Sequence, residues 1–245
     1  MISVDISDSN SHGASSDDKP RRRWFALVGY LCVLLIWPAL AILRTPADPL
    51  DFVWQIESDR LGAYTASMIF LWSMFAVIVV FQLIERRRIA ELGFTTPRAK
   101  DFLYGILFLL GAYPLLAALA LGLESIGLAI PEMVIKALLP VTTVERAAWI
   151  GLSITAAVCE ESVFRGYLLV NGEAVLKSRA LAGALSVAAF GIGHYYQGWG
   201  GVILISFYGL LFTWLRYRTG SLWACIVAHA VQDVISGFLG SLVHS

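Results

Sequence analysis

The chain has 245 residues, of which 58% are apolar and 15% are charged, and its mean hydropathy is +0.72. Soluble domains contain about 45–50% apolar and about 25% charged residues, so this composition indicates an integral membrane protein. The formal net charge is zero, which gives no electrostatic case for a nucleic-acid partner. At about 20 residues per crossing, the chain is long enough for an all-α bundle of transmembrane helices.

The first half of the chain carries a polar tail and three long apolar runs. Residues 1–19 are rich in Ser and Asp, so we expect a disordered cytoplasmic tail and no cleavable signal peptide. Residues 20–124 form the N-terminal transmembrane helices, with crossings expected at 24–43, 63–84 and 102–123. Residues 125–146 are amphipathic and contain a proline, so we interpret them as an interfacial or partly inserted segment, with an eighth crossing as the alternative.

Residues 147–243 contain four further apolar runs, which brings the predicted total to about seven crossings. These runs are 147–170, 181–195, 200–217 and 222–243, and the second is short for a crossing. With seven crossings, the Lys and Arg clusters near residues 19–23, 86–88, 98–100, 177–179 and 216–218 all fall on one side. The positive-inside rule then predicts a cytoplasmic N-terminus.

The run 147–170 contains two adjacent carboxylates and an arginine. A charged side chain at the bilayer centre costs about 2.5–3.5 kcal/mol on insertion scales, so this motif predicts a functional site. Glu161 and Arg165 are four residues apart and share one helical face, which favours an ion pair between them. Glu160 points about 100° away and is left free to face a water-filled cavity. The alternative is a buried packing network of all three side chains without chemistry.

Two later runs add histidines. His194 ends a helix of small residues, where Gly183, Gly191 and Gly193 permit close helix approach, and it could meet a carboxylate or simply cap its helix. His229 and Asp233 are four residues apart on one face, so they can form a base with its orienting partner, a metal-ligand pair or a buried hydrogen bond. Together, these side chains on three helices can activate water.

The ordered motifs resemble those of a known family. Glu160-Glu161-xxx-Arg165, Phe190-xxx-His194 and His229-xxx-Asp233 are similar to the motifs of the CPBP intramembrane proteases (CAAX protease and bacteriocin-processing), which include the type II CAAX prenyl endopeptidases, also called the Abi family. The resemblance covers about residues 145–240 and implies a four-helix catalytic core within residues 147–243. The short connections resemble a compact bacterial or archaeal member, which implies the inner membrane as its location.

The resemblance also implies the chemistry. The expected activity is hydrolysis of a peptide bond near the C-terminus or at a processing site of a membrane-associated protein or small peptide. Glu160 would be the general base, His194 would help to activate the water, and His229 would stabilise the oxyanion with Asp233, a position where the family commonly has Asn. Glu161, Arg165 and Phe190 would support the site.

Two matters stay open at the level of sequence. The HExxH motif of zinc proteases is absent, and the family resemblance implies a glutamic-type protease, so metal-free catalysis is favoured. The alternative is zinc held by Glu160, His194, His229 and Asp233. A proton-coupled transporter and a non-catalytic immunity or scaffold protein are the alternative functions, because intramembrane acids and histidines also relay protons.

Overall fold

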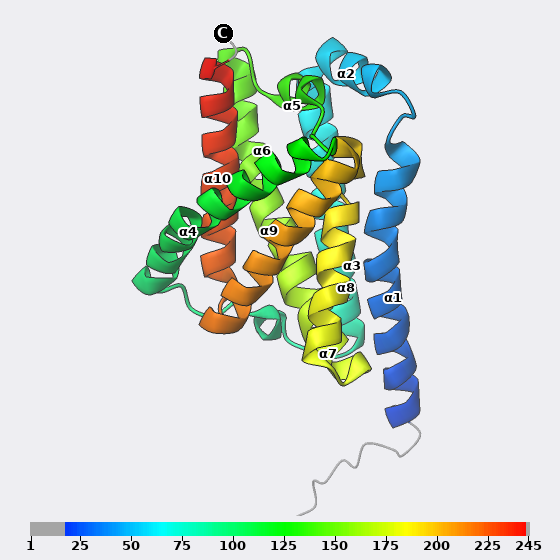
Figure 1. Cartoon of the computed structure of the whole chain (residues 1–245). Helices are drawn as coiled ribbons and strands as arrows, with labels where there is room; N and C mark the ends of the chain where they lie inside the picture. Colours follow the sequence, from blue (N-terminus) through cyan, green and yellow to red (C-terminus); the bar gives the residue numbers. More distant parts are fainter. Residues whose placement is uncertain (1–17, 244–245) are drawn as a thin grey trace, which may run out of the picture.

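The computed structural model describes residues 18–243, and within them every regular element is helical. Figure 1 shows α1 (Asp18–Arg44), α2 (Pro49–Ser58), α3 (Arg60–Ile84), α4 (Ala99–Ser125), α5 (Glu132–Leu138), α6 (Thr143–Glu161), α7 (Leu168–Leu176), α8 (Arg179–Ile192), α9 (Gly198–Thr219) and α10 (Leu222–Val243). Short turns η1 (Ile89–Leu92) and η3 (Tyr195–Gln197) lie between them. Since α1 starts at Asp18, the last two residues of the expected 1–19 tail are helical, and the rest of that tail lies outside the described residues.

Six helical segments among the described residues are long and apolar enough to cross a membrane. Five are α1 from Trp24, α3, α4, η3 with α9, and α10, and the sixth runs continuously from α6 through α7. The predicted all-α fold is therefore confirmed for the described residues, and six candidate spans stand where about seven crossings were predicted. Helix α8, predicted as part of a seventh crossing, has 14 residues and spans about 21 Å, less than the ~30 Å of a hydrocarbon core.

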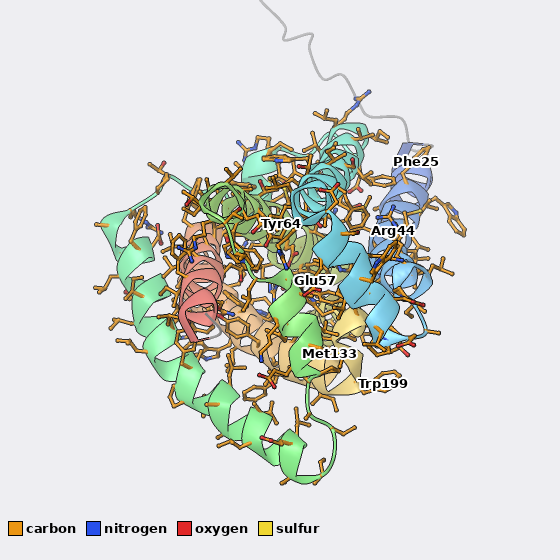
Figure 2. All side chains as sticks on the ribbon, turned by 90° about the horizontal axis from the view of Figure 1, so that it is seen from above. Phe25, Arg44, Glu57, Tyr64, Met133 and Trp199 are labelled. Carbon is orange, nitrogen blue, oxygen red and sulfur yellow. The ribbon has the colours of Figure 1, made fainter. Side chains whose placement is uncertain are left out.

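The long helices give the bundle two distinct ends. The short helices α2 and α5 lie at one end, here called the α2–α5 end, and the α7–α8 junction lies at the other, here called the α7–α8 end (Figure 1). Figure 2 looks onto the α2–α5 end, where Arg44, Glu57 and Met133 are labelled. Because α5 is a separate seven-residue helix, residues 125–146 contain no helix long enough for the alternative eighth crossing.

Local sequence signals explain where these helices begin. Asp48 caps α2 by accepting a hydrogen bond from the Leu50 amide at 2.9 Å, and Pro49 occupies the first turn. Thr142 and Glu145 form a reciprocal capping box at the start of α6. The capped start of α6 lies at the α2–α5 end, so the chain descends from there toward the acidic pair.

The descent from α6 to α7 passes through a π-helical turn, η2 (Ser162–Tyr167), which the apolar pattern of the sequence does not predict. Serine hydroxyls donate hydrogen bonds to backbone carbonyls around this turn. Ser162 Oγ donates to Val158 O at 2.5 Å, and Ser186 Oγ on α8 donates to Phe164 O at 2.7 Å. Such π-turns interrupt the regular ladder and are frequent at functional sites. All six residues of η2 are buried.

Glycines bring α8 close to its neighbours. A Cβ on Gly193 would lie 1.8 Å from Trp37 Nε1 on α1, and a Cβ on Gly191 would lie 1.8 Å from Ser206 Oγ on α9. The expected close approach is therefore confirmed at these two positions. Gly183 is less constrained, because a Cβ at this position would lie 3.5 Å from its nearest neighbour, which is an ordinary contact.

A polar cluster joins α3 to α7 at the α7–α8 end. Asn171 is fully buried, donates to Gln82 Oε1 at 3.4 Å and accepts a hydrogen bond from the Arg87 guanidinium. Tyr167 donates to Glu85 Oε1 at 3.5 Å. These contacts fix η2 and α7 against α3. They thereby hold the acidic pair at the end of α6 in place.

Candidate active site

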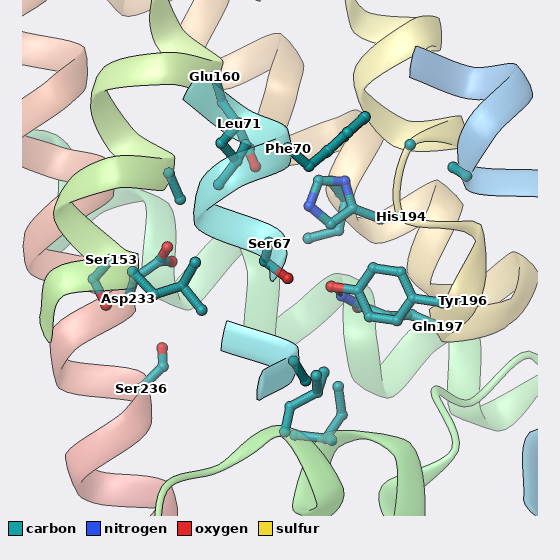
Figure 3. A pocket seen from close by; sticks show the side chains of 18 of the residues that line it. Ser67, Phe70, Leu71, Ser153, Glu160, His194, Tyr196, Gln197, Asp233 and Ser236 are labelled. Atoms are coloured by element: carbon teal, nitrogen blue, oxygen red, sulfur yellow. Dashed lines mark hydrogen bonds between the residues drawn. The ribbon is translucent and has the colours of Figure 1, made fainter. Parts of the chain in front are cut away.

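A cavity of about 650 Å³ lies inside the bundle. The four residues predicted to carry chemistry, Glu160, His194, His229 and Asp233, all line it. They come from α6, from the end of α8 and from α10, so three helices converge on one space. Figure 3 shows Glu160, His194 and Asp233 around this space, with Ser67 of α3 between them.

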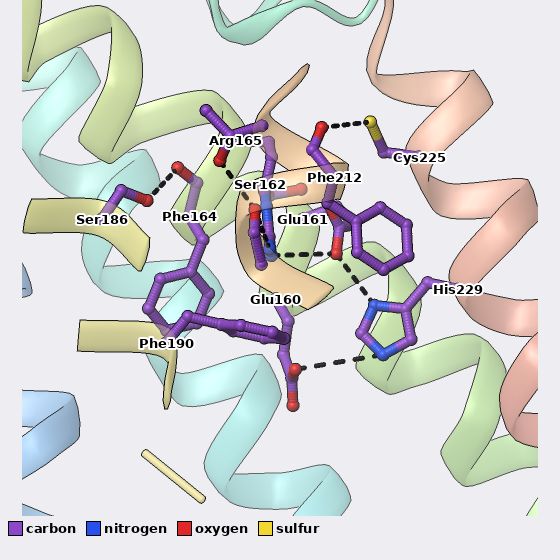
Figure 4. A network of polar contacts seen from close by, with 12 residues as sticks. Glu160, Glu161, Ser162, Phe164, Arg165, Ser186, Phe190, Phe212, Cys225 and His229 are labelled. Atoms are coloured by element: carbon purple, nitrogen blue, oxygen red, sulfur yellow. Dashed lines mark hydrogen bonds and ion pairs between the residues drawn. The ribbon is translucent and has the colours of Figure 1, made fainter. Parts of the chain in front are cut away.

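The two adjacent glutamates face different surroundings. Glu160 is 8% exposed and borders the cavity, whereas Glu161 is fully buried and does not line it. Glu161 Oε1 lies 3.1 Å from Nη1 of Arg165, which forms the predicted i, i+4 ion pair (Figure 4). The helical spacing thus separates the pair into a cavity-facing acid and an acid that holds an arginine.

Arg165 is enclosed by apolar and backbone groups. Its guanidinium donates to Glu161 and to the Gly209 carbonyl at 3.2 Å, and it is 1% exposed. The guanidinium carbon lies 4.2 Å from the ring centre of Phe190 and 5.1 Å from that of Phe212. Aromatic faces attract a cation electrostatically, so these rings help to stabilise a charge at membrane depth. Phe190 supports the arginine and also contacts the His194 ring, with the ring centres 5.0 Å apart.

His229 lies between three carboxylates. Its Nδ1 is 2.9 Å from Glu161 Oε1, and its Nε2 is 3.4 Å from Asp233 Oδ2 and 4.0 Å from Glu160 Oε2. An imidazolium would donate at both nitrogens, whereas a neutral ring that donates from Nδ1 would accept at Nε2 from a protonated carboxyl. In either arrangement one proton lies between His229 Nε2 and Asp233 Oδ2, and Glu160 is farther away at 4.0 Å.

His194 has a fixed ring orientation. Its Nδ1 lies 2.9 Å from Phe190 O, and because a carbonyl only accepts, Nδ1 carries the hydrogen. The neutral ring then keeps a lone pair on Nε2. The bond to a carbonyl in the last turn of α8 is the predicted helix-capping contact, and the same side chain borders the cavity.

Several cavity residues were not singled out from the sequence. Trp149, Ser153 and Ala156 line the cavity on the same face of α6 as Glu160, and their spacing of four, three and four residues was a usable helical signal. Trp149 Nε1 donates to the Asp233 carbonyl at 2.8 Å and so ties α6 to α10 beside the site. Tyr196 also lines the cavity and accepts a hydrogen bond from Gln197 Nε2 at 3.0 Å.

The walls of the cavity extend beyond the C-terminal helices. Trp37 of α1, Phe52 of α2 and Phe70 of α3 also line it. No three His, Cys, Asp or Glu side chains among the described residues are arranged to hold one metal ion. The donor geometry therefore does not fit the zinc alternative, which needs three protein ligands around an open position.

Comparison with known proteins identifies the segment that carries these residues. Residues 142–235 match the family model described as type II CAAX prenyl endopeptidase Rce1-like. This segment is an Rce1-like domain. No curated protein and no solved structure matches the chain.

The Rce1-like domain confirms the family resemblance inferred from the three motifs. It starts at Thr142, the capping residue of α6, and its match contains Glu160, His194, His229 and Asp233. Membership of this family implies a CAAX-type protease. The matched segment is less than half of the chain, and α1–α3, which supply part of the cavity wall, lie outside it.

Proposed function

We propose that the chain is an intramembrane endopeptidase in which Glu160 activates a water molecule for attack on a peptide bond. The observation that carries this proposal is the convergence of Glu160, His194, His229 and Asp233 on one cavity. Glu161, the acid outside the cavity, already interacts with Arg165 and His229 through its Oε1 atom. Glu160 is consequently the carboxylate that is available for proton transfer.

The proposed reaction starts with a water molecule between Glu160 and His194. Glu160 takes a proton from the water, and the Nε2 lone pair of His194 helps to orient it. The hydroxide adds to the scissile carbonyl. As the C–N bond of the tetrahedral intermediate breaks, Glu160 returns the proton to the leaving amine, and its carboxylate is regenerated for the next turnover. The buried position of Glu160 limits competing solvent.

His229 is proposed to stabilise the oxyanion by donating from Nε2. An ionised Asp233 would repel an oxyanion, so it is not proposed as a direct oxyanion donor. Its contact of 3.4 Å with Nε2 supports a different function, in which Asp233 holds the shared proton near His229 before the substrate binds. Glu161 fixes the ring from the opposite nitrogen at 2.9 Å. Glu161, Arg165 and Phe190 thus act as positioning residues.

The proposed topology has seven crossings. Helix α8 would provide the short seventh crossing, since it is apolar and runs from the α7–α8 end to the turn η3, where the span of α9 begins. Residues 20–124 would serve as N-terminal transmembrane helices, 125–146 as an interfacial segment and 147–243 as the catalytic core. The basic clusters support a cytoplasmic N-terminus in a bacterial or archaeal inner membrane. The substrate would be a membrane-associated protein or peptide.

Glu160→Gln tests the proposal. We expect loss of at least about a hundredfold in cleavage, because general acid–base catalysis typically contributes 10²–10⁴-fold. The measurement compares new protein termini in cells that express the chain and in cells that express the variant. Glu124→Gln, at an exposed acid on α4, is the matched control and should remain active. A folded Glu160→Gln variant that retains the cleavage pattern would contradict the proposal, and proton flux without cleavage would favour the transporter.

A further inference from the structure

The cavity is closed on one side and open on the other. Its floor is formed by buried side chains: Glu160 is 8% exposed, His229 7%, Phe190 3% and Phe212 fully buried. Exposed residues that line it include Arg44, Ser67 and Ser236. Arg44 is the last residue of α1, and the other two lie in the parts of α3 and α10 nearer the α2–α5 end.

The short helices of the α2–α5 end border this opening. Phe52 and Ile56 of α2 and Ile135 of α5 line the cavity, and Phe52 stacks on Tyr196 with ring centres 5.4 Å apart. Helix α2 has no buried residue, and its Trp54 is 72% exposed. An exposed tryptophan on a short helix that lies across a bundle end is typical of the membrane–water interface. The cavity mouth therefore lies near one membrane surface.

The charges distinguish which surface this is. Four basic residues lie at or next to the α2–α5 end, and they are Arg44, Arg60, Lys136 and Arg146. The larger group of basic residues lies at the opposite end of the bundle. This is the end where α1, α4, α8 and α10 begin and where α3, α7 and α9 end. The group consists of Arg21, Arg22, Arg23, Arg86, Arg87, Arg88, Arg98, Lys100, Lys177, Arg179, Arg216 and Arg218. Basic residues collect on the cytoplasmic side, so the mouth faces away from the cytoplasm.

We propose that the substrate enters from the extracytoplasmic side and is the membrane-proximal part of an anchored or exported polypeptide on that face. This inference rests on the proposed protease function for the cleavage and on the bundle geometry for the side of entry. A cytoplasmic tail would meet the α7–α8 end, where no residue between 161 and 189 lines the cavity, whereas an extracytoplasmic segment meets the opening beside α2 and α5.

The reach required of the substrate is short. Ser236 at the mouth and His229 at the floor are seven residues apart on α10, which corresponds to about 10 Å along the helix. An extended peptide covers about 3.3 Å per residue, so about three residues span this depth. The substrate therefore needs a short unwound segment next to its membrane anchor. A rigid transmembrane helix would not fit the proposed route.

Cysteine labelling tests the side of entry without using proteolysis. Ser236→Cys and Ser67→Cys should react with a membrane-impermeant thiol reagent in intact cells. Arg88→Cys is the matched control at the other end, where the Arg88 side chain is 86% exposed, and it should react only after the cells are permeabilised. The unsubstituted chain gives the background, because Cys159 and Cys225 are buried and Cys32 is partly exposed.

Each labelling outcome has a defined meaning. The reverse pattern would place the mouth in the cytoplasm and overturn the inference. So would a lack of labelling at both Ser236→Cys and Ser67→Cys in native membranes, if both react in denatured protein, because the mouth would then be closed.

The new termini that depend on Glu160 test the substrate class separately. Termini in extracytoplasmic, membrane-proximal segments would support the inference, and termini in cytoplasmic segments would overturn it while the protease function stands. If no terminus depends on Glu160 and the labelling still places the mouth outside, the protease function fails and the outward-facing cavity remains.

Discussion

Replacing Glu161 by Gln removes one carboxylate charge with almost no change of shape. Glu161 is fully buried and accepts a hydrogen bond from Arg165, whose guanidinium is then left with the Gly209 carbonyl and the surrounding aromatic faces. Removing one partner of a buried ion pair costs about 3–5 kcal/mol, and the cation–π contacts offset about 1 kcal/mol of this. We therefore expect Glu161→Gln to lower the free energy of unfolding by about 2–4 kcal/mol.

The assay is thermal unfolding of the purified protein in detergent micelles. For a chain of this size, each kcal/mol corresponds to about 2–4 °C, so the Tm should fall by about 4–16 °C. Glu160→Gln is the matched control on the neighbouring residue, and it should change the Tm by less than about 4 °C because Glu160 borders the cavity.

A second substitution separates the ion pair from other effects. The double variant Glu161→Gln/Arg165→Met should regain more than half of the lost Tm, because no unpaired charge then remains in the interior. A Glu161→Gln protein that unfolds within about 2 °C of the unsubstituted chain would refute the ion-pair reasoning. The same result would show that the rings and the carbonyl alone stabilise Arg165.

Three further outcomes are expected. Gly193→Ala should lower the free energy of unfolding by about 1–3 kcal/mol through the clash with Trp37, and thermal unfolding checks this against Gly111→Ala, whose Cβ would meet nothing within 4 Å. Hydrogen bonds from the Arg88 backbone amide and then from the Arg87 side chain lower the pKa of Glu91, in the loop after α3. The ionised Glu91 therefore stabilises the fold above its unfolded pKa of about 4.3, and this stabilisation is lost as the pH falls through the lower folded pKa. The Tm difference between Glu91→Gln and the unsubstituted chain should consequently vanish in acid. A zinc chelator should leave cleavage unchanged, and a loss that added zinc reverses would contradict metal-free catalysis.

The sequence was sufficient for features that depend on local spacing. Apolar runs predicted the long helices because about 20 apolar residues suffice to cross a bilayer. The i, i+4 spacing of Glu161 and Arg165 predicted their ion pair, since helical geometry places such residues side by side. The three motifs predicted the family because their order along the chain is itself a specific signal.

Features that depend on tertiary contact were not predictable in this way. Glu161 and His229 are 68 positions apart, and only the packing of α6 against α10 brings them to 2.9 Å. The contribution of α1–α3 to the cavity wall has no local signature, because Trp37 and Phe70 are ordinary apolar helix residues in the sequence. The inward position of Tyr196 was not predictable either, because the aromatic cluster of Tyr195, Tyr196 and Trp199 gives no indication of which ring faces inward.

The π-helical turn η2 sets the rotation of α7 about the helix axis relative to α6. One extra residue in a helical turn rotates everything after it by about 100° relative to an uninterrupted α-helix. Glu160 lies before η2 and faces the cavity, while Asn171 lies after it and faces Gln82 of α3. Removing one residue from η2 would turn one of these two side chains away from its partner. The turn thus lets a single continuous helix present an acid to water at one level and an anchoring amide to its neighbour at another.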